Sequence, residues 1–130
     1  MNTKASWSNW IFWLTMNLYF EARGESLEGK VAVCHVVMNR TVKRRKSVEE
    51  VIRESNQFSW YNGNIVPPVY QPLELIGCIE ALFVFFGERM RGLNLSGADH
   101  YFNPYLVLPS WAKSMVKIGL IGNHEFYRSK

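Results

Sequence analysis

The sequence lacks the signatures of several common enzyme classes. It contains no HExxH or HxH spacing, no GxSxG, no P-loop and no GxGxxG, so zincin, serine-hydrolase and nucleotide-binding patterns are absent. Its 2 cysteines, Cys34 and Cys78, form no CxxC pair. Both fall in apolar helical segments, so buried free thiols are expected and a disulfide stays open. No run of about 18 apolar residues predicts a membrane span.

The composition indicates one aromatic-rich, basic domain. With 130 residues, of which 48% are hydrophobic, the chain can bury a core of its own. We find no repeat or linker and predict a single domain over residues 1–130. Aromatic residues make up 15%, and aromatic faces often line clefts that bind sugars or bases, although most rings will pack in the core. The net charge of +4 favours an anionic polymer as partner, such as nucleic acid or a bacterial envelope.

The hydrophobic pattern predicts a mainly α (α+β) fold. Apolar spacing and capping signals predict helices over about 6–22, from a Ser26 cap to about 40–42, from a Ser47 to Glu50 capping box to about 54, and over 72–91. The last of these is expected to be the central buried helix, with an inward face made of Leu75, Ile76, Ile79, Leu82, Phe83 and Phe86.

The remaining segments are short. Residues 43–46 form a basic run, Lys-Arg-Arg-Lys, that is expected to be a solvated loop after the second helix. Residues 56–60 are expected to be extended or loop chain, and 61–68 to be a loop or a short hairpin arm. A loop is expected over 94–104, and short strands or turns over 116–128. A short helix is expected to start around Pro109 and Trp111.

Glu21 is the residue that the local pattern singles out. It lies seven residues after Leu14, so it continues the apolar stripe of the first predicted helix, and Gly24 then ends that helix. Burial and the negative end of the helix dipole both disfavour the ionised carboxylate. The expected rise in pKa suits a general acid at neutral pH. The alternative is a structural carboxylate that reaches solvent or pairs with Arg23.

The acidic residues are few outside helix surfaces. The chain has one Asp and ten Glu, and those near glycine-rich or aromatic loops are Glu21, Glu25, Asp99 and Glu125. A hydrolytic glycosidase usually needs two carboxylates across the scissile bond. A lytic transglycosylase needs one, because a hydroxyl of the sugar itself attacks the anomeric carbon. One Glu in an aromatic cleft fits the second chemistry at least as well.

The histidines offer a rival chemistry. His35, His100 and His124, or two of them with Asp99, could bind zinc in an amide-cleaving site. No ligand spacing supports this interpretation, and His35 lies inside a predicted helix. A structural or substrate-contact role is favoured for each histidine.

Several separated blocks, in order, resemble SleB/CwlJ-type cell-wall hydrolases. The first block runs from Tyr19 to Glu25 and continues through residues 29–33 to Val37, Asn39 and Arg40. Later blocks are Gln57-Phe58-Ser59-Trp60, residues 100–104, Pro109 with Trp111, and residues 121–124 with Phe126 and Tyr127. The resemblance extends over about residues 13–128.

The resemblance implies a lysozyme-like catalytic domain that acts on peptidoglycan glycan strands, with one catalytic Glu at Glu21. On this hypothesis the enzyme cleaves the β-1,4 bond between N-acetylmuramic acid and N-acetylglucosamine. Glu25 is the second candidate and is expected to orient Arg23 or the loop. Tyr101 and Asn103 are expected to stabilise the reacting sugar. The cleft is expected to be lined by Gln57, Ser59 and Trp60.

Two other expectations concern context. No signal peptide is recognised and no separate wall-binding domain is expected, which makes the chain look like a phage or prophage endolysin, made in the cytoplasm and released through a membrane lesion. We expect a monomer with no cofactor, no metal, no nucleic-acid partner and no membrane insertion. The competing hypotheses are a zinc-dependent peptidoglycan amidase and a non-catalytic wall-binding module.

Overall fold

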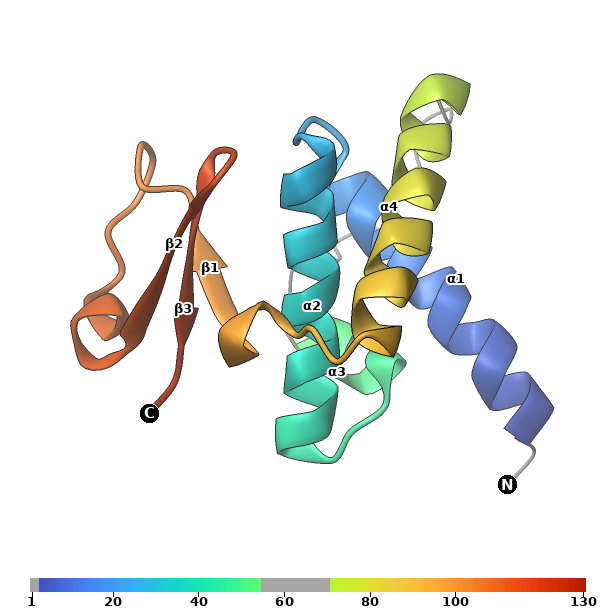
Figure 1. The fold of residues 1–130 in the computed structure, drawn as a ribbon, viewed down its shortest axis with the longest axis horizontal. Helices are drawn as coiled ribbons and strands as arrows, with labels where there is room; N and C mark the ends of the chain where they lie inside the picture. The colour runs from blue at the N-terminus through green and yellow to red at the C-terminus, as the bar shows by residue number, and fades with distance from the viewer. Residues whose placement is uncertain (1–2, 55–70) are drawn as a thin grey trace.

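The computed structural model describes residues 3–54 and 71–130, with side chains from Trp10 onward in these ranges. Figure 1 shows α2 in the middle, a small sheet on one side of it, and α1 and α4 on the other. The helices of the described part are α1 (Thr3–Ala22), α2 (Leu27–Arg44), α3 (Val48–Glu54) and α4 (Pro72–Met90). The mainly α (α+β) prediction is confirmed. None of these helices combines the length and the hydropathy that a membrane span requires.

Local capping signals start the helices where the sequence predicts them. The Ser26 side chain accepts a hydrogen bond from the backbone N–H of Gly29 at 3.1 Å and caps α2. Ser47 and Glu50 form the reciprocal capping box of α3, with both bonds at 3.1 Å. Pro72 is the first residue of α4. Gly92, with φ of 80°, follows the last turn of this helix.

The prediction that α2 ends at residues 40–42, before a basic loop, is wrong. The helix continues through Arg44, and Arg45 caps it in the left-handed conformation with φ of 54°. The basic run therefore begins in the last helical turn, where cations interact favourably with the helix dipole. It is also partly neutralised, because Lys43 pairs with Asp99 while Arg44 and Lys46 pair with Glu54.

The sheet is antiparallel with strand order β1-β3-β2. Its strands are β1 (His100–Phe102), β2 (Val116–Ile121) and β3 (His124–Arg128), and short 3-10 turns lie at Leu95–Gly97 and Ser110–Ser114. The strands in 116–128 and the short helix after Pro109 are confirmed. The prediction of a loop over 94–104 is wrong at β1, which pairs with β3 in a register that places Tyr101 opposite Phe126.

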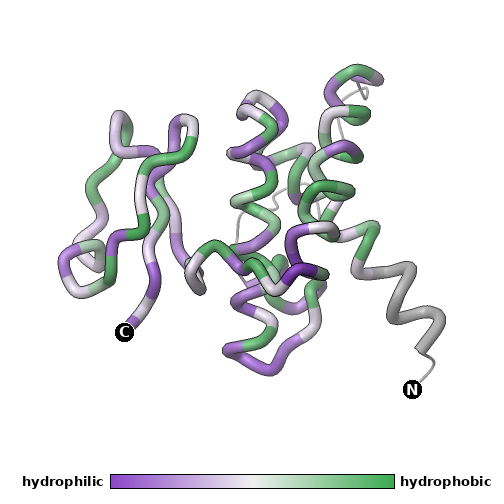
Figure 2. The backbone as a smooth tube through the Cα atoms, viewed as in Figure 1, coloured by the Kyte–Doolittle hydropathy of each residue, from purple (hydrophilic) through white to green (hydrophobic). Residues whose placement is uncertain are grey.

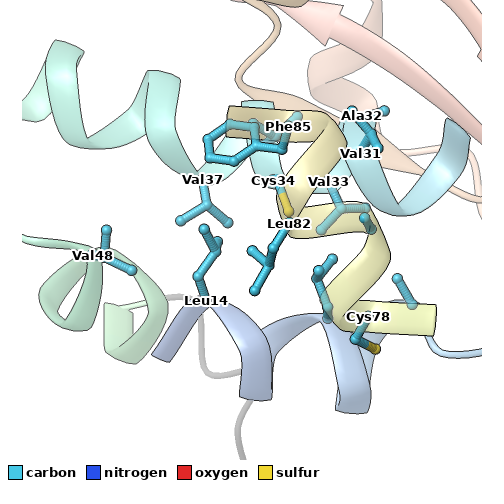
Figure 3. Packing of buried hydrophobic residues seen from close by; sticks show 14 of the residues in the cluster. Leu14, Val31, Ala32, Val33, Cys34, Val37, Val48, Cys78, Leu82 and Phe85 are labelled. Carbon is cyan, nitrogen blue, oxygen red and sulfur yellow. The ribbon is translucent and has the colours of Figure 1, made fainter. Parts of the chain in front are cut away.

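The core is built around α2, not around α4 as predicted. Figure 3 shows side chains of α1, α2, α3 and α4 meeting in one cluster, with Cys34 of α2 and Leu82 of α4 near its middle. Cys34 and Cys78 are free and buried. Burial raises the pKa of the Cys34 thiol, so it stays protonated and behaves as a small apolar side chain.

The predicted inward face of α4 is only partly right. Leu82 is buried, and Leu75 and Phe86 are partly buried against the core. Phe83 is 73% exposed, and Ile76 and Ile79 are also exposed, while the other buried positions are Cys78, Ala81 and Phe85. Figure 2 shows hydrophobic residues in most turns of α4. Because apolar residues occupy several faces, periodicity alone did not identify the face that packs on α2.

Candidate active site

Glu21 lies in the last turn of α1, between the helices and the sheet, and it is half-buried. Burial raises its pKa to about 7, while a hydrogen bond from Tyr101 and the charge of Arg40 act in the opposite direction. The expected direction of the shift is therefore confirmed, with burial as its main cause. A carboxyl group that titrates near neutral pH can donate a proton and afterwards accept one.

Tyr101 brings the sheet to Glu21. Its hydroxyl donates to Glu21 Oε2 at 3.5 Å, the long end of the range for a hydrogen bond. Burial, followed by the charge of Glu21, raises the pKa of Tyr101 well above its usual range, so the hydroxyl keeps its proton and remains a donor. Residues eighty positions apart in the sequence thus meet in one place, while the expected contact of Tyr101 with sugar stays a prediction.

Arg40 of α2 is a charged member of the site that the sequence did not single out. Its Nε donates to the backbone oxygen of Asp99 at 2.7 Å, which fixes the guanidinium against the start of β1. Burial lowers the pKa of Arg40, while Tyr101, Asp99 and Glu21 favour its charged form. Its positive charge in turn favours the ionised form of Glu21.

Asp99 anchors this part of the chain. Although burial alone would raise its pKa, hydrogen bonds from Lys43, Ser129 and His100 hold the pKa of the Asp99 carboxyl well below its usual range. A carboxylate with three such partners is a structural anion that joins α2, β1 and the end of β3. It is not a second general acid.

Of the two predicted roles of Glu25, orienting Arg23 or orienting the loop, its contacts agree with the second. Its side chain is 7% exposed, contacts His124 Nδ1, and accepts a hydrogen bond from Asn123 Nδ2 at 3.0 Å. Glu25 therefore joins the turn between α1 and α2 to the turn between β2 and β3. Arg23 instead lies over the Tyr19 ring, with Cζ 5.2 Å from its centre, and reaches the Glu74 carboxylate at 3.9 Å.

The structure does not test the sugar-binding role predicted for Asn103 or for the three residues expected to line the cleft. Asn103 follows β1, and its Oδ1 accepts a hydrogen bond from the backbone N–H of Tyr105 at 2.9 Å. This contact shapes the turn and leaves the proposed contact of Asn103 with sugar as a prediction. Three predicted cleft residues lie outside the described residues: Gln57, Ser59 and Trp60.

Each histidine contacts a different carboxylate. His35 is buried in α2 beside Glu88, with 2.8 Å between Nε2 and Oε1, and burial lowers its pKa. His100 Nδ1 lies 3.0 Å from Asp99, and His124 contacts Glu25. Over residues 3–54 and 71–130, no group of three or more His, Cys, Asp or Glu side chains is placed to hold a metal ion.

The raised pKa of Glu21 predicts a pH dependence of stability. A carboxyl whose pKa rises from 4.5 unfolded to about 7 folded favours the folded state below pH 4.5, and this contribution is lost as the pH rises through 7. Wild type should therefore lose up to about 3 kcal/mol of unfolding free energy between these limits, relative to Glu21→Gln. Urea denaturation of both proteins at pH 5 and pH 8 measures this difference. An equal pH response in the two proteins would show that Glu21 titrates normally.

This chain is similar to one protein family and to solved structures of two proteins. A family model described as Cell Wall Hydrolase matches residues 24–127, so Glu21 lies just before the matched range. The chain is similar to the catalytic domain of the germination-specific lytic transglycosylase SleB from Bacillus anthracis, with 25% identity, a TM-score of 0.67, and coverage of 92% of this chain and 94% of that one. It is also similar to the catalytic domain of the Bacillus cereus SleB protein, with 25% identity, a TM-score of 0.68, and coverage of 93% and 91%. No curated protein sequence matches significantly.

Proposed function

This chain belongs to the cell wall hydrolase family, and we propose that it cleaves the β-1,4 bond between N-acetylmuramic acid and N-acetylglucosamine with Glu21 as the single catalytic carboxyl. The family and the likeness to SleB catalytic domains support a peptidoglycan-cleaving enzyme. The specific bond and the role of Glu21 are the proposal.

The observation that carries the proposal is the environment of Glu21. The carboxyl is half-buried, titrates near neutral pH, and has a phenol donor and a guanidinium close by. A general acid works best when its pKa lies near the operating pH. Protonated Glu21 would donate its proton to the glycosidic oxygen, and the bond from that oxygen to the anomeric carbon would break.

The same group would then act as a base. Tyr101 and Arg40 favour the ionised form of Glu21, so they stabilise the carboxylate that remains after proton transfer. This carboxylate would remove a proton from the muramoyl 6-hydroxyl, giving a 1,6-anhydro end, or from water, giving a reducing end. The similar Bacillus anthracis protein is described as a lytic transglycosylase, which favours the first outcome.

Glu25 is not assigned the second carboxylate role of a hydrolytic glycosidase. One of its oxygens accepts from Asn123 and the other contacts His124, so the group is engaged within the protein. A mechanism with one catalytic carboxyl therefore fits the described residues better than a pair acting across the scissile bond.

The product ends test this proposal. Digestion of purified sacculi should release muropeptides with new sugar ends, and mass spectrometry should separate 1,6-anhydro ends from reducing ends by the mass of one water. New peptide amino groups without new sugar ends would overturn the glycosidase assignment and favour an amidase.

A related prediction concerns metals. Lysis of purified sacculi should continue at the same rate after extensive treatment with a chelator, because proton transfer by Glu21 needs no metal. Turbidity of the suspension gives the rate directly. If lysis stops with chelator and returns on addition of zinc, the Glu21 mechanism is wrong.

A further inference from the structure

Glu21 and Glu25 are connected by a chain of contacts that runs through two aromatic side chains of the sheet. Glu25 contacts His124, the His124 ring packs on the Tyr101 ring, and the Tyr101 hydroxyl reaches Glu21. We propose that His124, held in place by Glu25, is a positioning residue that keeps the Tyr101 hydroxyl directed at Glu21. This inference deepens the proposed function and rests on it.

The contact between Glu25 and His124 is fixed by a close approach of two turns. Glu25 and His124 have side chains 7% and 17% exposed, so their contact is shielded from solvent. Asn123 holds the other carboxylate oxygen of Glu25. Gly122 has φ of 61°, and a Cβ there would lie 3.4 Å from Glu25 Oε2, so the turn brings its backbone directly against this carboxylate.

His124 and Phe126 confine the Tyr101 ring. His124 and Phe126 are alternate residues of β3 and therefore face the same side of the sheet. The His124 ring meets the Tyr101 ring edge to face, with centres 5.1 Å apart and an interplanar angle of 86°. The fully buried Phe126 ring lies 5.6 Å from the same ring. These two neighbours restrict the ring, and hence the direction in which its hydroxyl points.

The hydrogen bond that Glu21 accepts, and with it the pKa of Glu21, depends on the orientation of the Tyr101 ring. Its hydrogen bond from Tyr101 is already long at 3.5 Å, so a small displacement of the ring would remove it. Within residues 3–54 and 71–130, the charged and titratable groups that act on Glu21 are Tyr101 from β1 and Arg40 from α2. Loss of the hydroxyl removes one of these two groups that favour the ionised carboxylate, so the pKa of Glu21 should rise.

The test is the titration of the Glu21 carboxyl carbon, followed by 13C NMR in the protein without substrate. Tyr101→Phe should raise the midpoint by about half to one pH unit. His124→Ala should shift it in the same direction. The double variant should show no more than the Tyr101→Phe shift, because His124 acts through the hydroxyl that is already absent.

The remaining outcomes overturn the proposal. A Tyr101→Phe shift without a His124→Ala shift would mean that the histidine does not position the ring. Additive shifts would mean that His124 acts on Glu21 directly.

If His124→Ala fails to fold, His124→Phe keeps an aromatic ring against Tyr101 and lacks the contact with Glu25, and it should shift the midpoint in the same direction by less. His100→Gln is the matched control, since His100 of β1 also pairs with a carboxylate, that of the adjacent Asp99, and it should leave the Glu21 midpoint unchanged.

Activity supplies the second readout. On soluble glycan strands, His124→Ala should lower kcat several-fold with a smaller change in KM. The alkaline limb of its pH–kcat profile should move to higher pH, as should that of Tyr101→Phe. The NMR titration does not require cleavage. A wild-type protein that cleaves no glycan would refute the proposed function, while an unmoved Glu21 midpoint in both His124 variants would refute the positioning role.

Discussion

Glu21→Gln is expected to fold like the wild type and to cleave peptidoglycan about 10²–10⁴-fold more slowly. Glutamine has nearly the same shape, so packing at the end of α1 is kept, but its amide cannot donate a proton to the glycosidic oxygen. At neutral pH the substitution should not lower stability and should raise it by up to the roughly 3 kcal/mol that ionisation of the buried carboxyl costs the wild type, because no partly ionised carboxyl then has to be desolvated. Initial lysis rates and thermal unfolding measure the two effects.

Glu25→Gln is the matched control. Its amide oxygen can still accept from Asn123, while the charge that faces His124 is lost. This variant should lose less activity than Glu21→Gln because Glu25 holds the turn and does not touch the reacting atoms. A loss confined to Glu25→Gln would move the general acid to that position.

Phe85→Ala is expected to destabilise the protein by about 3–5 kcal/mol. Phe85 is 1% exposed and packs against the His35 ring, with centres 4.9 Å apart, and against Phe86. Truncation would leave a cavity where α4 meets α2, inside the cluster that Figure 3 shows. Urea denaturation at one pH gives the free energy of unfolding.

Phe83→Ala, two residues earlier on the same helix, is the control for this prediction. Phe83 is 73% exposed, so its truncation should change stability by no more than about 0.5 kcal/mol. The pair distinguishes the two faces of α4 directly. A larger loss for Phe83→Ala than for Phe85→Ala would mean that α4 is packed with the face that its hydrophobic pattern first suggested.

Signals within a few residues were sufficient to predict much of the fold. The Ser26 cap, the Ser47 and Glu50 box and Pro72 act within one helical turn, so the sequence alone located the starts of α2, α3 and α4. Where the signal was ambiguous, the prediction failed. Helix α4 has phenylalanines at 83, 85 and 86, which lie on different faces, and only contact with α2 decides which one is buried.

The sequence alone predicted only those features of the candidate site that depend on residues close together in the chain. The burial and raised pKa of Glu21 could be predicted because this residue continues the apolar stripe of its own helix, which Gly24 then ends. Strand β1 was missed because it has three residues and is defined by pairing with β3, more than twenty positions later. Still larger separations along the chain hide the contacts of Glu25 with Asn123 and His124, and of Arg40 with the backbone of Asp99. No local pattern reports a contact that depends on how the sheet docks on α2.

The most direct test of the account is the rate at which new glycan ends appear, counted by mass spectrometry, when equal amounts of folded wild-type and Glu21→Gln protein digest the same purified sacculi. The account predicts muramic acid ends, in 1,6-anhydro or reducing form, that accumulate with wild type and fall by at least about 10²-fold with Glu21→Gln. Muramic acid ends produced by the variant at the wild-type rate would contradict it.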